Sequence, residues 1–274
     1  MEADAVAGAI ERLRGAFAAR GRVIVAFSGG VDSALLAFVA HTTLGPAAAL
    51  AVTVDGESLA PEERDEAVAF AAAHGLRHEV RFHSDLDDAR YVANDAARCQ
   101  FCREHMADHL LRLARESGGA TVVAGTHVDD ARDMRPGDAA LRAAGVWQPF
   151  VELGIGKPMI RAMARALGLE VADKPAGACL ASRIPRGTPI TAGALRQVAA
   201  AESAVRAAGF AQVRVRRLDD GRRARVEVAP HDVARAVALS QTWQRAWREL
   251  GFAVVEVAPE GYVAPSLAAV RFGQ

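Results

Sequence analysis

The sequence is short of cysteine and has no long apolar run. Its 274 residues include three cysteines, which cannot all pair within one chain, so a disulfide framework is not expected. No apolar run approaches the roughly 20 residues of a membrane-spanning helix. The N-terminal stretch is amphipathic and carries acidic residues, unlike a signal peptide. These absences predict a cytoplasmic protein with no membrane partner.

Lysine and net charge are also scarce. The chain has 33 basic and 33 acidic residues, and Lys157 and Lys174 are its only lysines. A neutral total argues against a general nucleic-acid surface, although a local basic patch can hide within it. We interpret the preference for arginine as genome composition. Nucleic acid is therefore not an expected partner.

The apolar residues, 51% of the chain, are enough for a sizeable core. Short apolar runs alternate with longer helical stretches over the first part of the chain. The predicted strands are 22–27, 49–54, 78–83 and 121–125, and the predicted helices are 3–19, 31–43, 61–74 and 102–116. Strands separated by helices of this length indicate an α/β fold with a doubly wound parallel sheet.

The pattern changes in the second half. Residues 126–156 are polar and turn-rich, which predicts a loop, and residues 174–191 form a loop too long for an idle connection. Later, Asp219-Asp220-Gly221 separates two β runs, which is a hairpin signal. The predicted helices are 157–167 and 191–208, followed by two helical stretches within 231–249, and the predicted strands are 212–218, 223–229 and 252–257. We expect a smaller α+β domain here.

The clearest motif lies between the first strand and its helix. It reads Ser28-Gly29-Gly30-Val31-Asp32-Ser33. The glycines let successive N–H groups converge on an anion, and the helix N-terminus adds its dipole. Ser28 and Ser33 add hydroxyl donors, and Asp32 suits Mg²⁺. The run is not a Walker A loop, because no lysine follows the glycines. It resembles the pyrophosphate (PP) loop of N-type ATP pyrophosphatases, which release pyrophosphate and leave an adenylated substrate; a glycine turn without a ligand is the alternative.

A second candidate for nucleotide contact is the end of the second strand. Val54 and Asp55 lie where open α/β sheets bind ligands, so backbone groups there can meet adenine. A strand that simply ends in a turn explains the same residues equally well.

The three cysteines are Cys99, Cys102 and Cys179. Three thiolates can hold a 4Fe–4S cluster and leave one iron open for an extra sulfide. Zinc is an alternative, with His105 as a further ligand. Direct sulfur donation by Cys179 is another, and so is burial as small hydrophobic residues. Flanking arginines favour the thiolate form.

Together these motifs resemble the LarE family of ATP-dependent sulfur transferases. The matching segments are 28–33, 98–102, 125–137, 178–191 and the basic hairpin at 214–218 and 223–228. The resemblance implies an adenine nucleotide alpha hydrolase-like fold, with a PP-loop domain at 1–173, a functional loop at 174–191 and a small substrate or oligomerisation domain at 192–274. It implies that ATP and Mg²⁺ adenylate a pyridinium dicarboxylic acid mononucleotide, whose carboxylates become thiocarboxylates for a nickel-pincer cofactor.

The resemblance also implies roles for individual residues. Family members with three cysteines resemble cluster-bearing enzymes, whereas members with only the last cysteine sacrifice its sulfur. We therefore expect a 4Fe–4S cluster on Cys99, Cys102 and Cys179, with Cys179 and Asp32 catalytic and sulfide or another sulfur donor as a partner. The candidates for binding the mononucleotide or Mg²⁺ are Arg183, Arg214, Arg216, Asp130, Asp133 and Arg135, with Glu202 and Glu227 as weaker ones. Solvated surface charges are the alternative for these, and a homo-oligomer is expected.

Three other functions remain open from the sequence. A PP-loop tRNA thiolase also joins such a loop to three cysteines, but the neutral charge and the lack of an RNA module argue against it. An amide-forming synthetase for NAD or GMP has no use for the cysteines. A nucleotide or metal sensor would bind ATP without cleaving it.

Overall fold

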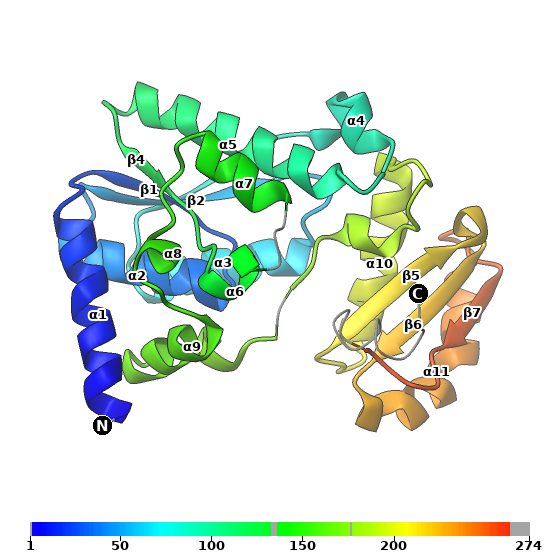
Figure 1. The fold of residues 1–274 in the computed structure, drawn as a ribbon. Coiled ribbons are helices and arrows are strands. Elements are labelled where there is room, and N and C mark those ends of the chain that lie inside the picture. The colour runs from blue at the N-terminus through cyan, green and yellow to red at the C-terminus, as the bar shows by residue number, and fades with distance from the viewer. Residues whose placement is uncertain (1, 133–135, 176, 264–274) are drawn as a thin grey trace. The chain divides into compact units, whose positions relative to one another are not determined.

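The computed structural model describes residues 2–132, 136–175 and 177–263. The chain divides into two compact units (Figure 1). The first comprises Met1–Tyr91 and Ala96–Gly177, and the second comprises Val92–Asp95 and Ala178–Gln274. In the described residues, no helix has both the length and the apolar character needed to cross a membrane.

A parallel sheet forms the centre of the first unit. Its strands are β1 (Val23–Ala26), β2 (Ala49–Asp55), β3 (His78–Phe82) and β4 (Thr121–Val123), in the order β3-β2-β1-β4. Val23 of β1 pairs with Ala49 on one side and with Thr121 on the other. The chain thus builds outward from β1 in one direction and then returns to its other side, which makes the end of β1 a topological switch point. The predicted doubly wound parallel sheet is confirmed.

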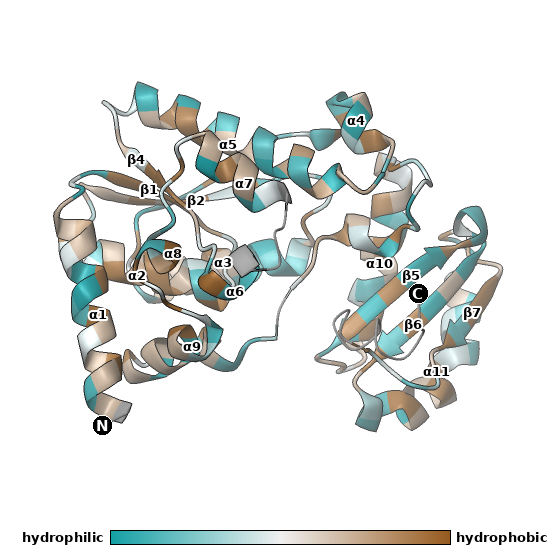
Figure 2. Ribbon diagram, viewed as in Figure 1, coloured by the Kyte–Doolittle hydropathy of each residue, from teal (hydrophilic) through white to brown (hydrophobic). Residues whose placement is uncertain are grey.

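Helices cover both faces of this sheet, as alternation along β1 requires. Val23 and Val25 pack with α1 (Glu2–Ala18), α2 (Val31–Leu44) and α9 (Lys157–Ala166). Ile24 packs on the opposite face with α5 (Arg98–Glu116) and α7 (Pro136–Ala143). Helix α5 lies on one side of the sheet, and α2 and α9 lie on the other (Figure 1). Along α1 and α5, hydrophilic and hydrophobic residues alternate, as expected of helices with one buried side (Figure 2). The remaining helical elements of this region are α3 (Pro61–Ala73), η1 (Asp85–Asp87), α4 (Ala89–Val92), α6 (Val128–Arg132), α8 (Pro149–Glu152) and η2 (Glu170–Asp173).

Two segments differ from the prediction. Helix α5 begins at Arg98 rather than near 102, and its N-cap, Ala97, makes no side-chain cap that the sequence could reveal. The predicted loop at 126–156 contains α6, α7 and α8, which span five, eight and four residues. Helices this short cover too few turns for hydrophobic periodicity to show them.

The second unit is the predicted small α+β fold. Strands β5 (Val213–Leu218) and β6 (Arg223–Val228) pair antiparallel, and β7 (Val254–Val257) pairs parallel with β6. Asp219 and Asp220 both have positive φ, 50° and 52°, in the short η4 turn (Asp219–Gly221) that closes the predicted hairpin. The sheet packs on α10 (Ala192–Ala207) and α11 (Val233–Ala246) through a core that includes Trp243 and Trp247. The other helical turns are η3 (Leu180–Arg183) and η5 (Pro230–Asp232).

Candidate active site

The glycine-rich loop joins β1 to α2 at the switch point and is held by its two serines. The Ser28 backbone N–H donates to Ser33 Oγ at 3.1 Å, and Ser33 Oγ donates to the Gly30 carbonyl at 3.1 Å. The two hydroxyl oxygens lie 3.2 Å apart. These bonds fold the loop back on the first turn of α2, so both hydroxyls sit beside the helix N-terminus, where anions bind well.

Gly29 is the position in this loop that requires glycine. Its φ is +69°, and a Cβ placed there would lie 3.0 Å from Cα and from Cβ of Ala67 on α3. A side chain at Gly29 would therefore be strained by its own backbone and would crowd Ala67, a buried residue of α3. Gly30 is the N-cap of α2 and has an ordinary extended conformation, φ −78°.

Both lysines of the chain lie at this loop. Lys157, at the start of α9, places Nζ 2.5 Å from Asp32 Oδ2. Lys174 donates from Nζ to the Gly29 carbonyl at 3.0 Å and pairs with Glu66 at 2.8 Å. Neither lysine has a role that the sequence alone predicts, because both lie more than a hundred residues along the chain from the loop. Their rarity in an arginine-rich chain was the one signal available.

Asp32 offers a ligand for a cation. Its Oδ1 is buried and has no hydrogen-bond partner among the described residues, while Oδ2 faces Lys157. A buried carboxylate oxygen without a donor is costly unless a cation satisfies it. The residues present therefore fit Mg²⁺, a hard cation that prefers oxygen ligands.

The end of β2 lies at the same edge of the sheet. Thr53 is buried and its hydroxyl shares a 2.8 Å hydrogen bond with His78 Nε2. Asp55 lies 3.6 Å from a guanidinium nitrogen of Arg64. Val54 and Asp55 are half-buried, so their predicted contact with adenine stays a prediction. Burial lowers the pKa of His78 below its ordinary value.

In the polar segment after β4, the acidic side chains contact nearby residues. Asp130 Oδ2 lies 3.2 Å from His127 Nε2. Asp129 accepts a 2.8 Å hydrogen bond from the Lys157 backbone N–H, which ties this segment to α9. Of the three site residues predicted here, Asp133 and Arg135 lie outside the described residues, and the role of Asp130 stays a prediction.

The cysteines divide between the two units. Cys99 and Cys102 occupy the first turns of α5 in the first unit, and Cys179 is the N-cap of η3 in the second. Their spacing of three residues puts Cys99 and Cys102 on neighbouring positions of one helix face. Cys99 is exposed, and Arg98 donates to its sulfur at 3.5 Å. A cationic neighbour favours the thiolate that any metal or sulfur chemistry needs.

His105, the further ligand of the zinc alternative, is occupied elsewhere. Its Nδ1 lies 2.8 Å from Asp85 Oδ1, and its Nε2 lies 2.9 Å from Asp88 Oδ2. Burial lowers the pKa of His105, but the hydrogen bonds with Asp85 and Asp88 outweigh it, so the net shift is upward. In this arrangement both ring nitrogens face carboxylates.

Within the second unit, the buried Arg183 side chain holds the backbone at Ala178 and Cys179, a segment called here the Cys179 loop. Its side chain is 3% exposed and pairs with the fully buried Glu202 at 2.7 Å. Its Nη1 also donates to the carbonyls of Ala178 and Cys179, at 2.7 and 3.1 Å. Glu202 accepts in addition from the Val215 backbone N–H on β5. The backbone at Cys179 is thereby tied to both α10 and β5.

Arg214 and Arg216 lie on one face of β5, as the two-residue period predicts, because Val213 and Val215 point into the core on the other. Arg216 is bound to both carboxylate oxygens of Glu227 at 3.1 Å and donates to the Ser182 carbonyl at 2.8 Å. The Arg214 guanidinium lies 4.8 Å from the centre of the Tyr262 ring. Burial, and then repulsion by the nearby Arg183, lowers the pKa of Arg214.

Known proteins resemble this chain at two levels: a family profile matches part of the chain, and individual proteins match most of it. A family profile described as NAD synthase matches residues 11–110. An uncharacterized protein of Synechocystis sp. is 39% identical over 259 residues, covering 92% of this chain and 94% of the relative. Pyridinium-3,5-bisthiocarboxylic acid mononucleotide synthase of Lactiplantibacillus plantarum is 32% identical over 241 residues, covering 88% of this chain and 87% of the relative. An uncharacterized protein of Methanocaldococcus jannaschii is 25% identical over 195 residues, with coverage of 71% and 73%.

Proposed function

The chain belongs to the family of pyridinium-3,5-bisthiocarboxylic acid mononucleotide synthases, the LarE family, and from this premise we propose that it is an ATP-dependent sulfur transferase. Its substrate is a pyridinium dicarboxylic acid mononucleotide, whose carboxylates it converts to thiocarboxylates for a nickel-pincer cofactor. The observation that carries the proposal is that one chain contains both a PP loop contacted by Lys157 and Lys174 and the three cysteines, Cys99, Cys102 and Cys179.

The first step is adenylation. ATP lies with its phosphates against the loop 28–33, where Ser28 and Ser33 hydroxyls and the N-terminus of α2 offer donors. Lys157 at Asp32 and Lys174 at the Gly29 carbonyl add positive charge to the loop. Asp32 holds Mg²⁺, which screens the charge of the phosphates. The substrate carboxylate attacks the α-phosphorus, the bond to the β-phosphate oxygen breaks, and pyrophosphate leaves.

The second step replaces AMP by sulfur. An acyl adenylate has the good leaving group that a carboxylate lacks, so hydrosulfide displaces AMP and gives a thiocarboxylate, AMP and a proton. We propose that Cys99, Cys102 and Cys179 would hold a 4Fe–4S cluster, and that this cluster would supply sulfide when bound. This part of the proposal rests on the family resemblance and on the presence of three thiols, because Cys99 and Cys102 belong to the first unit and Cys179 belongs to the second. Direct donation by Cys179 is the alternative.

The second unit supplies substrate contacts in this proposal. Arg214 and Arg216 present cationic groups on one face of β5 and are the candidates for the mononucleotide phosphate. Arg183 holds the Cys179 loop through its carbonyl contacts. The predicted homo-oligomer stays a prediction.

Adenylation is tested by pyrophosphate release from ATP in the presence of the mononucleotide. Replacing Asp32→Asn removes the proposed Mg²⁺ ligand and lowers the rate by at least about 10²-fold. The matched control is Asp65→Asn on α3, an exposed acid that pairs with Arg64, and it keeps the parental rate. ATP binding without pyrophosphate release would instead indicate a sensor.

The sulfur source is tested by purifying the protein without oxygen and measuring iron and sulfide. About four irons per chain support the cluster, and serine at Cys99, Cys102 or Cys179 should each remove them. One zinc and no iron would overturn the cluster. Conversion of Cys179 to dehydroalanine after one turnover, with its sulfur found in the product, would identify that residue as the donor. A mobility shift with tRNA would favour the thiolase.

A further inference from the structure

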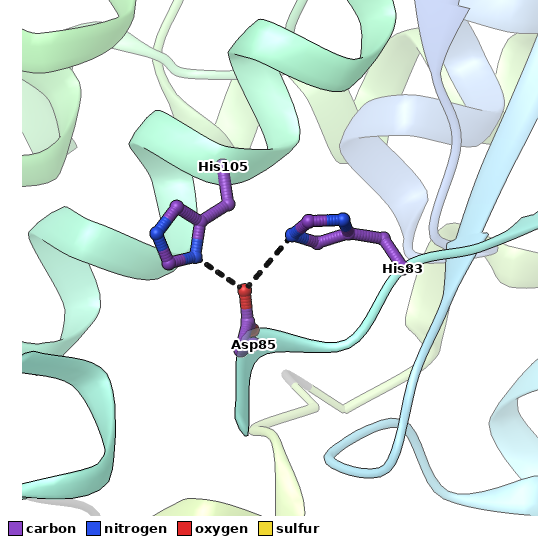
Figure 3. Close-up of side chains that lie close together, drawn as sticks. All are labelled: His83, Asp85 and His105. Atoms are coloured by element: carbon purple, nitrogen blue, oxygen red, sulfur yellow. Dashed lines mark hydrogen bonds and ion pairs between the residues drawn. The ribbon is translucent and has the colours of Figure 1, made fainter. Parts of the chain in front are cut away.

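A second group of metal-ligating side chains lies at the end of β3, apart from the PP loop and the cysteines. Asp85 Oδ1 is 2.8 Å from His105 Nδ1 and 3.8 Å from His83 Nε2 (Figure 3). One ligand atom from each of His83, Asp85 and His105 lies within 4.8 Å of the others. In the described part of the chain this is the one such group of three found. The two imidazoles come from different elements, the loop after β3 and helix α5.

The separations are those of a transition-metal site. Zinc binds nitrogen and oxygen at about 2.0–2.2 Å in a tetrahedron, which puts neighbouring ligand atoms about 3.3 Å apart. The two distances to Asp85 Oδ1, 2.8 and 3.8 Å, bracket that value, and all three ligand atoms lie within 4.8 Å of one another. Small rotations of the side chains, without movement of the backbone, would therefore bring all three atoms onto one ion.

His83 supplies an independent sign of a ligand. Its Nε2 is buried and has no hydrogen-bond partner in the described residues, whereas buried polar atoms are nearly always paired. The backbone holds this ring in place, because the His83 N–H donates to the Asp55 carbonyl at 2.8 Å. The unsatisfied nitrogen points toward Asp85 (Figure 3).

His105 has the support that metal-bound histidines usually have. Its second nitrogen, Nε2, lies 2.9 Å from Asp88 Oδ2. A carboxylate on that side fixes the ring orientation and directs Nδ1 to the metal, as in carboxylate–histidine–zinc arrangements. Asp85 and Asp88 come from the same short segment at η1, so one turn provides both the ligand and the support.

We propose that His83, Asp85 and His105 bind one divalent transition-metal ion, which joins the loop after β3 to helix α5. Two imidazoles and one carboxylate suit zinc better than magnesium or calcium, which take oxygen ligands. Helix α5 also carries Cys99 and Cys102, so the ion stabilises the helix on which that pair stands. The site does not depend on the proposed sulfur transfer.

The test uses a full-length variant in which serine replaces Cys99, Cys102 and Cys179, so that thiols cannot bind the probe. Titration with Co²⁺ should give one equivalent bound, with a spectrum that lacks thiolate-to-cobalt charge transfer. His83→Gln, Asp85→Asn and His105→Gln should each weaken binding at least 10-fold, and Asp88→Asn should weaken it about 10–100-fold. His74→Gln is the matched control, because His74 also pairs with an acid, Glu170, but has no second histidine beside it.

Circular dichroism establishes that each variant is folded. If the serine variant does not fold, X-ray absorption of the zinc-loaded parent chain replaces the titration, and a shell of nitrogen and oxygen that disappears in His105→Gln supports the site. Absence of Co²⁺ binding to the folded serine variant would overturn the proposal. Equal loss in His74→Gln and His105→Gln would also overturn it, as would unchanged binding in the double variant at His83 and His105.

Discussion

Lys157 is the side chain that we expect to contribute most to charge balance at the PP loop. Its Nζ lies 2.5 Å from Asp32, so without nucleotide it partly neutralises the carboxylate that we assign to Mg²⁺. We propose that the same ammonium interacts with the phosphate oxygens of ATP. Lys174 also lies at the loop, where its Nζ donates to the Gly29 carbonyl.

We predict that Lys157→Met lowers pyrophosphate release by about 10²–10³-fold, the usual cost of removing one preorganised charged donor from a transition state. The measurement is the steady-state rate of pyrophosphate formation with saturating ATP. Arg14→Met serves as the control, because Arg14 is an exposed cation of the same unit that pairs with Glu11. A rate within threefold of the parent chain, on the order of 0.65 kcal/mol, would exclude Lys157 from the phosphate site.

Glu202 joins several parts of the second unit through its buried carboxylate. It is fully buried and accepts from Arg183, from Arg206 and from the Val215 backbone N–H. Replacing Glu202→Ala leaves the buried Arg183 guanidinium without its counter-ion, which costs about 3–5 kcal/mol in free energy of unfolding. Denaturant unfolding followed by tryptophan fluorescence measures this.

The control for that experiment is Glu249→Ala, because Glu249 is exposed and surface substitutions usually change stability by no more than about 0.5 kcal/mol. If Glu202→Ala were as mild as Glu249→Ala, the buried ion pair would not anchor the Cys179 loop.

At the scale of elements, the turn between β1 and α2 sets what the site can do. Its two glycines differ: Gly29 has a left-handed conformation against Ala67 of α3, and Gly30 has an extended one. The loop therefore depends on how closely α3 packs against the end of β1, and not only on the motif itself.

We predict that Gly29→Ala lowers the free energy of unfolding by about 1–3 kcal/mol, because an alanine there takes a left-handed conformation, and that it weakens ATP binding. Gly30→Ala should keep most of the stability, since its backbone suits any residue and Ser28 Oγ, 3.5 Å away, is the nearest atom. Thermal unfolding and ATP titration of the two variants provide the comparison. Equal stability of the two variants would contradict the close packing at Ala67.

At the scale of the whole molecule, the chain has two units with separate apolar cores. One core gathers around β1 and the helices on both sheet faces, and the other around β5, β6 and α11. The tryptophans report on them separately: Trp147 belongs to the first unit, and Trp243 and Trp247 belong to the second.

We predict that ATP with Mg²⁺ raises the unfolding temperature seen by Trp147 in a Trp243→Phe, Trp247→Phe variant. Binding at about 100 times the dissociation constant adds about 2.7 kcal/mol to the unit that holds the ligand. A Trp147→Phe variant, which reports on the second unit, should show the smaller shift. A larger shift in the Trp147→Phe variant would place the nucleotide site in the second unit and contradict the prediction.

Local patterns were enough to predict most elements of this fold. Apolar runs and helical periodicity found the parallel strands, and Asp219-Asp220-Gly221 predicted the hairpin, because these signals act over a few residues. They failed at α5, whose start has no side-chain cap, and at the short helices α6, α7 and α8.

The sequence by itself therefore determined the elements, the phosphate loop and the identity of the chemistry-bearing side chains. Only the tertiary structure decided which of them meet. It brought Lys157 and Lys174 to the loop, buried Arg183 against Glu202, and gathered His83 and His105 around Asp85. Lys157 and Lys174 lie 125 and 145 residues from their partners at the loop, and His105 and Glu202 lie 20 and 19 residues from Asp85 and Arg183. Such pairings follow from how the elements pack together, which no short stretch of sequence specifies.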